Sequence, residues 1–200
     1  MCVDSTIIIS ELNIVLFLLY IQMQFFDHPK VFSIPLGPVN KDEIANILRT
    51  TPNMTNRTNL LFISNSDSET RLPITKRIIS NFHGTVTNRY NDGVTNYYEL
   101  LQMSKYILCP SGLGWDTYRT GEALVLGAIP ILETFYRKDG MYRAYDNLPV
   151  LWVDHYDNVT PELLEDEYPR ILSKAREYTF EKLTNQYWID LVNTYRSKNI

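Results

Sequence analysis

Short apolar runs alternate with longer mixed segments along most of the chain. The clearest run, 60–64 (LLFIS), is apolar at nearly every position, which is typical of a strand buried on both faces of a parallel sheet. Similar runs recur at regular intervals and end at turn or breaker residues. The predicted strands cover 30–34, 60–64, 84–90, 106–109, 128–132 and 149–153.

The segments between these runs have helical character. The strongest helix start is Thr160-Pro161-Glu162, which supplies a capping hydroxyl, a first-position proline and an acid in the first turn. Helical sequence then continues nearly to the end, with predicted breaks at 168–169 and near Thr179. The other predicted helices cover 41–49, 75–82, 96–104 and 116–127. Strands that alternate with helices predict a doubly wound α/β domain with a C-terminal helical tail.

The segment 106–133 is a strand–loop–helix–strand unit in a parallel sheet. Its loop, Pro110-Ser111-Gly112-Leu113-Gly114, has two glycines, whose backbone reaches conformations closed to other residues. The loop precedes a helix N-terminus, where free N–H groups favour a phosphate. The loop is neither a Walker loop nor a full dinucleotide fingerprint. It therefore indicates either a phosphate site or a tight turn without a ligand.

Arg119 and Glu122 are three residues apart and share one face of the predicted helix. One interpretation is a helical ion pair that contributes a few tenths of a kcal/mol. The other gives each residue its own ligand group. Arg119 would bind phosphate oxygens with two parallel hydrogen bonds, and Glu122 would accept hydrogen bonds from two ribose hydroxyls.

Composition excludes several classes of protein. The 200 residues carry a net charge of −4 without a basic block, so nucleic-acid binding is not expected. The two cysteines do not have the spacing of a zinc motif, and Cys109 in an apolar run is expected to be a buried thiol rather than a bridge partner. The sequons at Asn53, Asn56 and Asn158 are glycan acceptors if the chain enters the secretory pathway.

The N-terminal segment, residues 1–29, is largely apolar, but Glu11 and Asn13 interrupt it. Its uninterrupted apolar part is shorter than the roughly 20 apolar residues that a membrane-spanning helix needs. It also lacks the basic start and the cleavage site of a signal peptide. Three interpretations remain: the remnant of a truncated domain, a membrane anchor, or mis-assigned sequence.

Other candidate groups lie at the predicted carboxyl ends of strands, where open α/β sheets bind ligands. Glu133 ends one strand and is either a cleft acid or a solvated loop residue. His155 follows another strand and is the best candidate for a general base. No nucleophile–base arrangement is evident, and no catalytic residue is assigned. Asp67, Glu69 and Arg71 after the strand at 60–64 either reach the cleft or form a solvated surface. His28 and His83 are scattered, without a carboxylate at a telling spacing.

The order of these motifs along the chain indicates a protein family more specifically than any single motif does. The runs 104–112, 116–119, 122–124 and 127–131 resemble the donor-binding half of exostosin-like glycosyltransferases. They are also similar to the C-terminal part of ribitol-5-phosphate xylosyltransferase and its relatives. The resemblance is strong over 97–133 and looser over 30–161. It implies a GT-B architecture, in which two Rossmann-like domains face each other and the C-terminal one holds the nucleotide sugar.

The resemblance also implies roles for individual residues. Gly112 and Gly114 would approach the diphosphate, Arg119 would neutralise phosphate charge, and Glu122 would hold the ribose. Such enzymes generally need no bound metal and no cofactor beyond the nucleotide-sugar co-substrate, here expected to be a UDP-sugar. The implied donor-binding residues are Ser111, Gly112, Gly114, Arg119 and Glu122.

Two departures from the family pattern matter. Many GT-B enzymes carry a second glutamate eight residues before the position of Glu122, where this chain has Gly114. A GT-B enzyme also needs an N-terminal acceptor domain, which often supplies the catalytic base, but only about 30 residues precede the first predicted strand here. The chain is therefore expected to be a fragment, a truncated gene model or a donor-binding module that works with another chain. The expected organisation is the N-terminal segment, a nucleotide-sugar-binding domain at 30–160 and C-terminal helices at 161–200.

The expected function is the donor-binding domain of an inverting glycosyltransferase that transfers a sugar to an acceptor hydroxyl. The acceptor would be a glycan or glycoconjugate, and the expected location is the Golgi or the endoplasmic reticulum, with a possible membrane anchor in an upstream or N-terminal segment. Without an acceptor domain, the chain is expected to bind nucleotide but to transfer sugar poorly. The alternatives are a non-catalytic nucleotide-sugar-binding or interaction module, or another nucleotide-sugar enzyme such as an epimerase.

Overall fold

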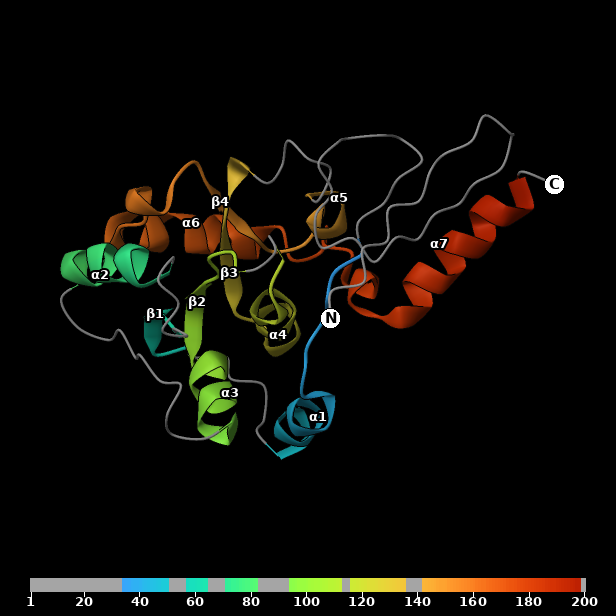
Figure 1. Cartoon of the computed structure of the whole chain (residues 1–200), viewed down its shortest axis with the longest axis horizontal. Coiled ribbons are helices and arrows are strands. Elements are labelled where there is room, and N and C mark those ends of the chain that lie inside the picture. The colour runs from blue at the N-terminus through green and yellow to red at the C-terminus, as the bar shows by residue number, and fades with distance from the viewer. Residues whose placement is uncertain are drawn as a thin grey trace.

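The computed structural model describes residues 34–50, 57–64, 71–82, 94–112, 116–135 and 142–198. Its centre is a parallel four-stranded sheet in the order β1-β2-β3-β4, without reversal (Figure 1). The predicted strand at 84–90 lies outside the described residues, as does the one at 30–34 except for Ile34, which is not in a strand. The strands are β1 (Asn59–Phe62), β2 (Ser104–Leu108), β3 (Ile129–Glu133) and β4 (Leu151–Val153).

Helices cover both faces of the sheet, so the predicted α/β fold is confirmed as a Rossmann-like arrangement (Figure 1). The 3-10 helices η2 (Tyr156–Asn158) and η3 (Phe180–Leu183) accompany the α-helices. The α-helices are α1 (Lys41–Thr50), α2 (Arg71–Asn81), α3 (Val94–Gln102), α4 (Tyr118–Leu126), α5 (Tyr142–Tyr145), α6 (Pro161–Ser173) and α7 (Asn185–Lys198).

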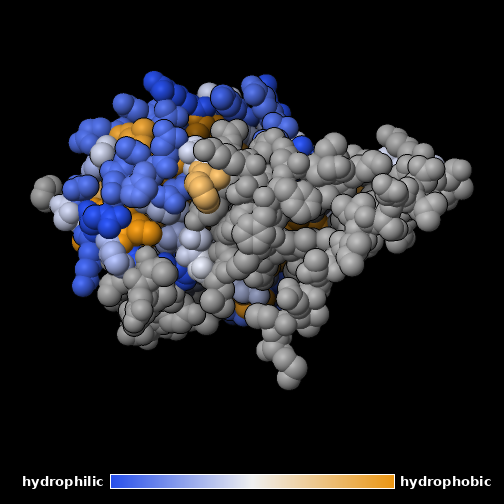
Figure 2. All heavy atoms as spheres, turned by 45° about the horizontal axis from the view of Figure 1, so that its top comes forward, coloured by the Kyte–Doolittle hydropathy of each residue, from blue (hydrophilic) through white to orange (hydrophobic). Residues whose placement is uncertain are grey.

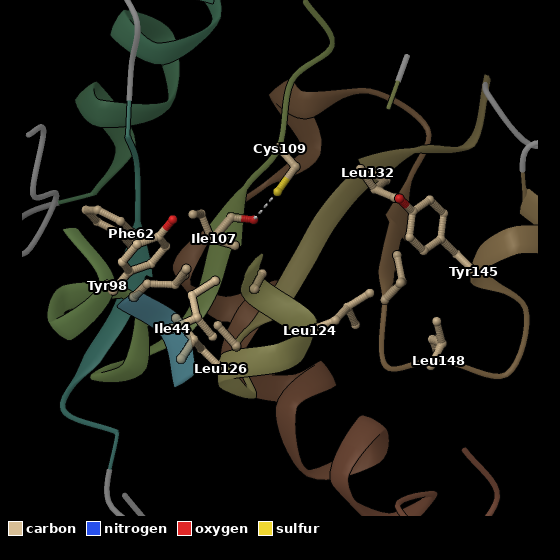
Figure 3. Close-up of a cluster of buried hydrophobic side chains, with 14 of the residues drawn as sticks. Ile44, Phe62, Tyr98, Ile107, Cys109, Leu124, Leu126, Leu132, Tyr145 and Leu148 are labelled. Carbon is tan, nitrogen blue, oxygen red and sulfur yellow. Dashed lines mark hydrogen bonds between the residues drawn. The ribbon is translucent and has the colours of Figure 1, made fainter. Parts of the chain in front are cut away.

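Alternating strand residues divide the core into two layers. Phe62, Ile107 and Leu132 point toward α1, α3 and α4 (Figure 3). Leu61 and Ile131 point the other way and pack against α2 and α6. Figure 2 brings this second side forward and shows that its described surface is mainly hydrophilic with small apolar patches. The strands are therefore buried on both faces, as their continuous apolar runs predict.

The helix α4 is shorter than predicted but ends as expected. It begins at Tyr118 rather than Asp116, because Thr117 is still extended. It ends at Gly127, whose φ of 78° lies in the left-handed region that favours glycine. The next residue, Ala128, donates its N–H to the carbonyl of Ala123 at 2.9 Å and starts the turn into β3. This turn fixes the distance between the helix and the following strand.

Arg57 joins three elements at the amino edge of the sheet. Its Nη1 donates to the carbonyls of Gln102 at 2.6 Å and Ser104 at 2.8 Å, and its Nη2 donates to that of Leu126 at 2.8 Å. Partial burial lowers the pKa of the guanidinium. Arg57 therefore satisfies free carbonyls at the ends of α3 and α4 with one cation, which also suits the negative ends of their helix dipoles.

Two predicted helix boundaries are wrong. The helix predicted over 96–104 ends at Gln102, because Ser104 pairs with Asn59 and opens β2. The helix predicted from residue 75 begins four residues earlier, at Arg71, and holds Pro73 in its first turn, where a missing N–H costs no helical bond.

The predicted break at 168–169 is also wrong, because α6 continues through Pro169. Pro169 and Glu165, the residue one turn before it, are both exposed, so water can reach the carbonyl that lacks a donor. The predicted start is confirmed, since Thr160 Oγ accepts the N–H of Leu163 at 3.2 Å. The break near Thr179 is confirmed as well: α6 ends at Ser173, and η3 follows Thr179.

A buried lysine attaches the C-terminal helices to the domain. Lys182 Nζ donates to the carbonyls of Arg143 at 3.0 Å and Asp146 at 2.7 Å, at the end of α5. Burial lowers the pKa of Lys182. Trp188, in the first turn of α7, donates its indole N–H to the Lys182 carbonyl at 2.8 Å. The segment after α6 therefore packs on the same layer as α4 and α5.

The segment before α1 crosses α4 at close range. A Cβ placed on Gly121 would lie 2.9 Å from the backbone of Gly37 and 3.2 Å from the nitrogen of Pro38. Only glycine permits this contact without a backbone shift. Gly37 has a φ of 68°, so the crossing uses a second glycine for its conformation. The two glycines keep the chain close to the helix that carries Arg119 and Glu122.

Candidate functional site

The candidate site begins where β2 ends, at the carboxyl edge of the sheet. Cys109 and Pro110 are buried, Ser111 is half-buried and Gly112 is exposed. Gly114 lies outside the described residues. The loop therefore rises from the core to the surface ahead of α4. Its place at the carboxyl ends of parallel strands is the usual one for ligands in open α/β sheets.

Arg71 from the start of α2 reaches this loop. Its Nε donates to the carbonyl of Ser111 at 2.9 Å. A Cβ on Gly112 would collide with Nη2 of Arg71. Gly112 does not have a positive φ. A side chain at this position would require the end of the Arg71 side chain to move, so glycine leaves room for the arginine. Of the two interpretations left open for Arg71, the structure shows the one in which it contacts this edge of the sheet.

Arg119 is buried in the first turn of α4, with a relative exposure of 8%. Its Nε and Nη1 have no hydrogen-bond partner, and within the described ranges no ion pair joins it to Glu122. The helical ion pair is therefore not formed. A buried guanidinium without a partner is costly unless something satisfies it. This arrangement leaves Arg119 available to an anion.

Glu122 is buried beside it, and both of its carboxylate oxygens accept hydrogen bonds. Tyr97 donates to Oε2 at 3.0 Å, and Tyr98 donates to Oε1 at 2.9 Å (Tyr98 is labelled in Figure 3). Burial, and then the charge of Glu122, raise the pKa of both tyrosines. Two adjacent tyrosines of α3 therefore hold the carboxylate in a fixed orientation. No pattern in the sequence indicated this contact.

Asp116 is a buried carboxylate ahead of α4 that the sequence did not mark as important. Its Oδ1 accepts from the hydroxyl of Tyr145 at 2.5 Å and from the N–H of Thr117 at 2.8 Å. Its Oδ2 accepts from the N–H of Leu36 at 2.7 Å. Burial raises the pKa of Asp116, and the hydrogen bonds oppose that rise. Asp116 therefore ties the segment before α1, the start of α4 and α5 together.

Glu133 and His155 lie at the ends of β3 and β4. Oε1 of Glu133 accepts the N–H of Tyr156 at 3.1 Å and lies 3.9 Å from Nε2 of His155. Nδ1 of His155 accepts the N–H of Asp157 at 3.2 Å and so caps η2. Among the described residues, no hydrogen bond or ion pair joins this group to Arg119 or Glu122.

The remaining candidates have different outcomes. Cys109 is a buried free thiol, as predicted, and burial raises its pKa to about 12. Among the described residues, no group of His, Cys, Asp and Glu side chains could hold a metal ion. A search of the same residues found no helix that is both long and apolar enough to cross a membrane. His28, His83, Asp67 and Glu69 lie outside the described residues.

The comparisons with known proteins agree with the fold. A family model described as the RXYLT1 C-terminal domain matches residues 39–188. The match covers well over half of the chain and includes Arg119, Glu122 and both tyrosines that bind Glu122. No curated protein matches the chain. The chain belongs to the RXYLT1 C-terminal domain family and is a glycosyltransferase-related α/β domain.

Proposed function

We propose that this domain holds the diphosphate of a UDP-sugar at the carboxyl edge of its sheet while an acceptor hydroxyl attacks the sugar. One observation carries this proposal: the buried Arg119 has two guanidinium nitrogens without a partner. A phosphate group accepts parallel hydrogen bonds from a guanidinium and supplies the missing negative charge. The proposed donor-binding domain spans residues 30–160, followed by the C-terminal helices.

The amino end of α4 supports an anion at the same place. Thr117 occupies the capping position, but its side chain accepts no hydrogen bond from the first turn, in which the N–H of Thr120 already donates to the Thr117 carbonyl at 3.0 Å. Those N–H groups and the positive end of the helix dipole favour a phosphate. Arg71 beside Ser111 and Gly112 adds positive charge next to this helix end. The proposed phosphate contacts are Arg119, the backbone of Ser111, Gly112 and Gly114, and the helix N–H groups.

Glu122 is proposed to bind the ribose. Each carboxylate oxygen accepts one tyrosine hydroxyl and keeps capacity for another hydrogen bond. The tyrosines hold the carboxylate in one orientation, which reduces the entropy that a ribose contact would cost. The ribose hydroxyls would thus bind a carboxylate that is already positioned.

The chemical contribution of this site would be stabilisation of the leaving group. As the bond between the sugar and the phosphate breaks, negative charge grows on the diphosphate, and a fixed guanidinium lowers the free energy of that charge. The base that activates the acceptor is not among the proposed residues. The domain alone is therefore expected to bind the donor and to transfer sugar poorly.

The proposal is tested by calorimetric titration of the purified chain with UDP and with UDP-sugars. Arg119→Gln is expected to weaken UDP binding by about 10-fold or more, because a charged hydrogen-bond partner of the phosphate is lost. Arg170→Gln is the matched control, since Arg170 is 71% exposed and pairs only with Glu167 on its own helix. Equal affinities for wild type and Arg119→Gln would contradict the assignment.

One observation favours a second candidate, a non-catalytic nucleotide-sugar-binding or interaction module. Both oxygens of Glu122 already have partners within the protein, as in a purely structural contact. In that case UDP does not bind, or Glu122→Gln changes stability but not affinity. UDP binding that Glu122→Gln weakens argues for the donor site instead.

We also propose that the protein works in the Golgi or the endoplasmic reticulum, with a glycan or glycoconjugate as acceptor. Membership of a glycosyltransferase-related family supports this location. The sequon residue Asn158 is exposed, so its side-chain nitrogen is accessible to modification. Treatment of the cellular protein with an N-glycosidase tests the location, and an unchanged mobility would argue against it.

A further inference from the structure

Ser64 carries a second buried polar atom without a partner. It lies two residues after the end of β1 at Phe62, and its relative exposure is 1%. Its Oγ forms no hydrogen bond. A buried hydroxyl without a partner costs free energy that alanine at the same place would not cost. Contacts within the protein therefore do not explain why a serine occupies this position.

The sheet brings Ser64 level with the end of β2. Leu61 pairs with Tyr106 and Phe62 with Ile107, so the same register carries Ser64 to Cys109. Side chains alternate along the strand, and Ile63 packs on the layer of α2 and α6. Ser64 therefore faces the layer of α3 and α4, together with Phe62 and Cys109, which Figure 3 shows on that side.

Arg119 lies on the same layer and at the same edge. The ring of Tyr97 packs against Phe62, with a centroid distance of 5.6 Å, and its hydroxyl binds Glu122. Arg119 is close enough to the Tyr97 hydroxyl and the Cys109 thiol to lower the pKa of both, against the larger effect of burial. The two unpartnered donors, Ser64 just after β1 and Arg119 on α4, therefore have common neighbours.

We infer that Ser64 is a phosphate-binding residue, whose hydroxyl donates to the anion that Arg119 neutralises. This inference rests on the proposed function and adds a contact from a different strand. A phosphate has only acceptor atoms, so it can satisfy a guanidinium and a hydroxyl together. A ribose hydroxyl would satisfy Ser64 but would leave the charge of Arg119 without a partner.

The test measures UDP affinity and thermal stability for Ser64→Ala in the whole chain. UDP binding is expected to weaken by about 10-fold, because a hydrogen bond to a charged group is lost. The melting temperature without ligand is expected to stay the same or rise, because the variant removes an unsatisfied buried group. Affinity for uridine, which has no phosphate, is expected to be unchanged.

Ser104→Ala is the matched control. Ser104 is also a buried serine, in the neighbouring strand, but its hydroxyl already donates to the Leu100 carbonyl at 2.7 Å. This variant is expected to lower the melting temperature and leave UDP affinity unchanged. Ser64→Ala is thus expected to weaken UDP affinity without lowering the melting temperature, whereas Ser104→Ala is expected to do the reverse.

The possible results separate the inference from the proposed function. If wild type does not bind UDP, both are overturned. If wild type binds UDP, Arg119→Gln weakens binding and Ser64→Ala does not, only the role of Ser64 is overturned. A lower melting temperature for Ser64→Ala with unchanged affinity would indicate that the hydroxyl serves internal packing, and it would also overturn the inference.

Discussion

Asp116→Ala is expected to reduce the free energy of unfolding by about 3–5 kcal/mol, enough to unfold a domain of ordinary stability. The carboxylate accepts hydrogen bonds from the Leu36 N–H, the Tyr145 hydroxyl and the Thr117 N–H. Alanine removes all three acceptor contacts at once. The Tyr145 hydroxyl, which is fully buried, would keep its desolvation cost without a partner.

Urea denaturation followed by circular dichroism measures this effect, with Asp166→Ala on the exposed side of α6 as the control. Asp116→Asn is expected to be intermediate, because its amide oxygen can still accept while its NH₂ group meets another donor. If the Asp116→Ala variant were as stable as wild type, Asp116 would not be the residue that joins these segments.

Arg57→Ala is expected to reduce the free energy of unfolding by about 2–4 kcal/mol. Its guanidinium donates three hydrogen bonds of 2.6–2.8 Å to carbonyls of Gln102, Ser104 and Leu126. Without it, the ends of α3 and α4 lose a shared donor and a cation that complements both helix dipoles. The side chain of Gln102 already has a buried oxygen, Oε1, without a hydrogen-bond partner.

The same denaturation experiment tests Arg57, with Arg49→Ala as the control, since Arg49 is exposed and donates only to Ala45 within α1. Arg57→Lys is expected to recover part of the loss, because an ammonium keeps the charge but cannot reproduce the planar fork. A lysine variant equal to wild type would mean that charge alone is sufficient. An alanine variant equal to wild type would contradict the structural role.

Patterns in the sequence predicted the strands and the helix ends that depend on residues close together in the chain. The apolar runs at 60–64, 106–109 and 128–132 predicted β1, β2 and β3, because buried parallel strands need continuous apolar sequence. The end of α4 was found because Gly127 adopts a left-handed conformation. Boundaries failed where a tertiary contact decided them, as at Ser104, whose pairing with β1 overrides its helical surroundings.

The contacts within the site were not predictable from the sequence. Tyr97 and Tyr98 meet Glu122 from residues 25 and 24 positions away, and no periodicity links them. The spacing of Arg119 and Glu122 suggested an ion pair, but the tyrosines take up the carboxylate and leave the arginine unpaired. The sequence thus marked Arg119 and Glu122 as candidates for the site, while the fold determines which groups they contact.

The thiol of Cys109 can be used to measure how often the protein unfolds locally around it. Its thiol is fully buried below the candidate site, and its raised pKa keeps it protonated and unreactive. After Cys2 is replaced by serine, a thiol reagent can react only during the moments when the edge of the sheet separates. The rate of labelling then measures how often this region opens, on the scale of local unfolding rather than of the whole domain.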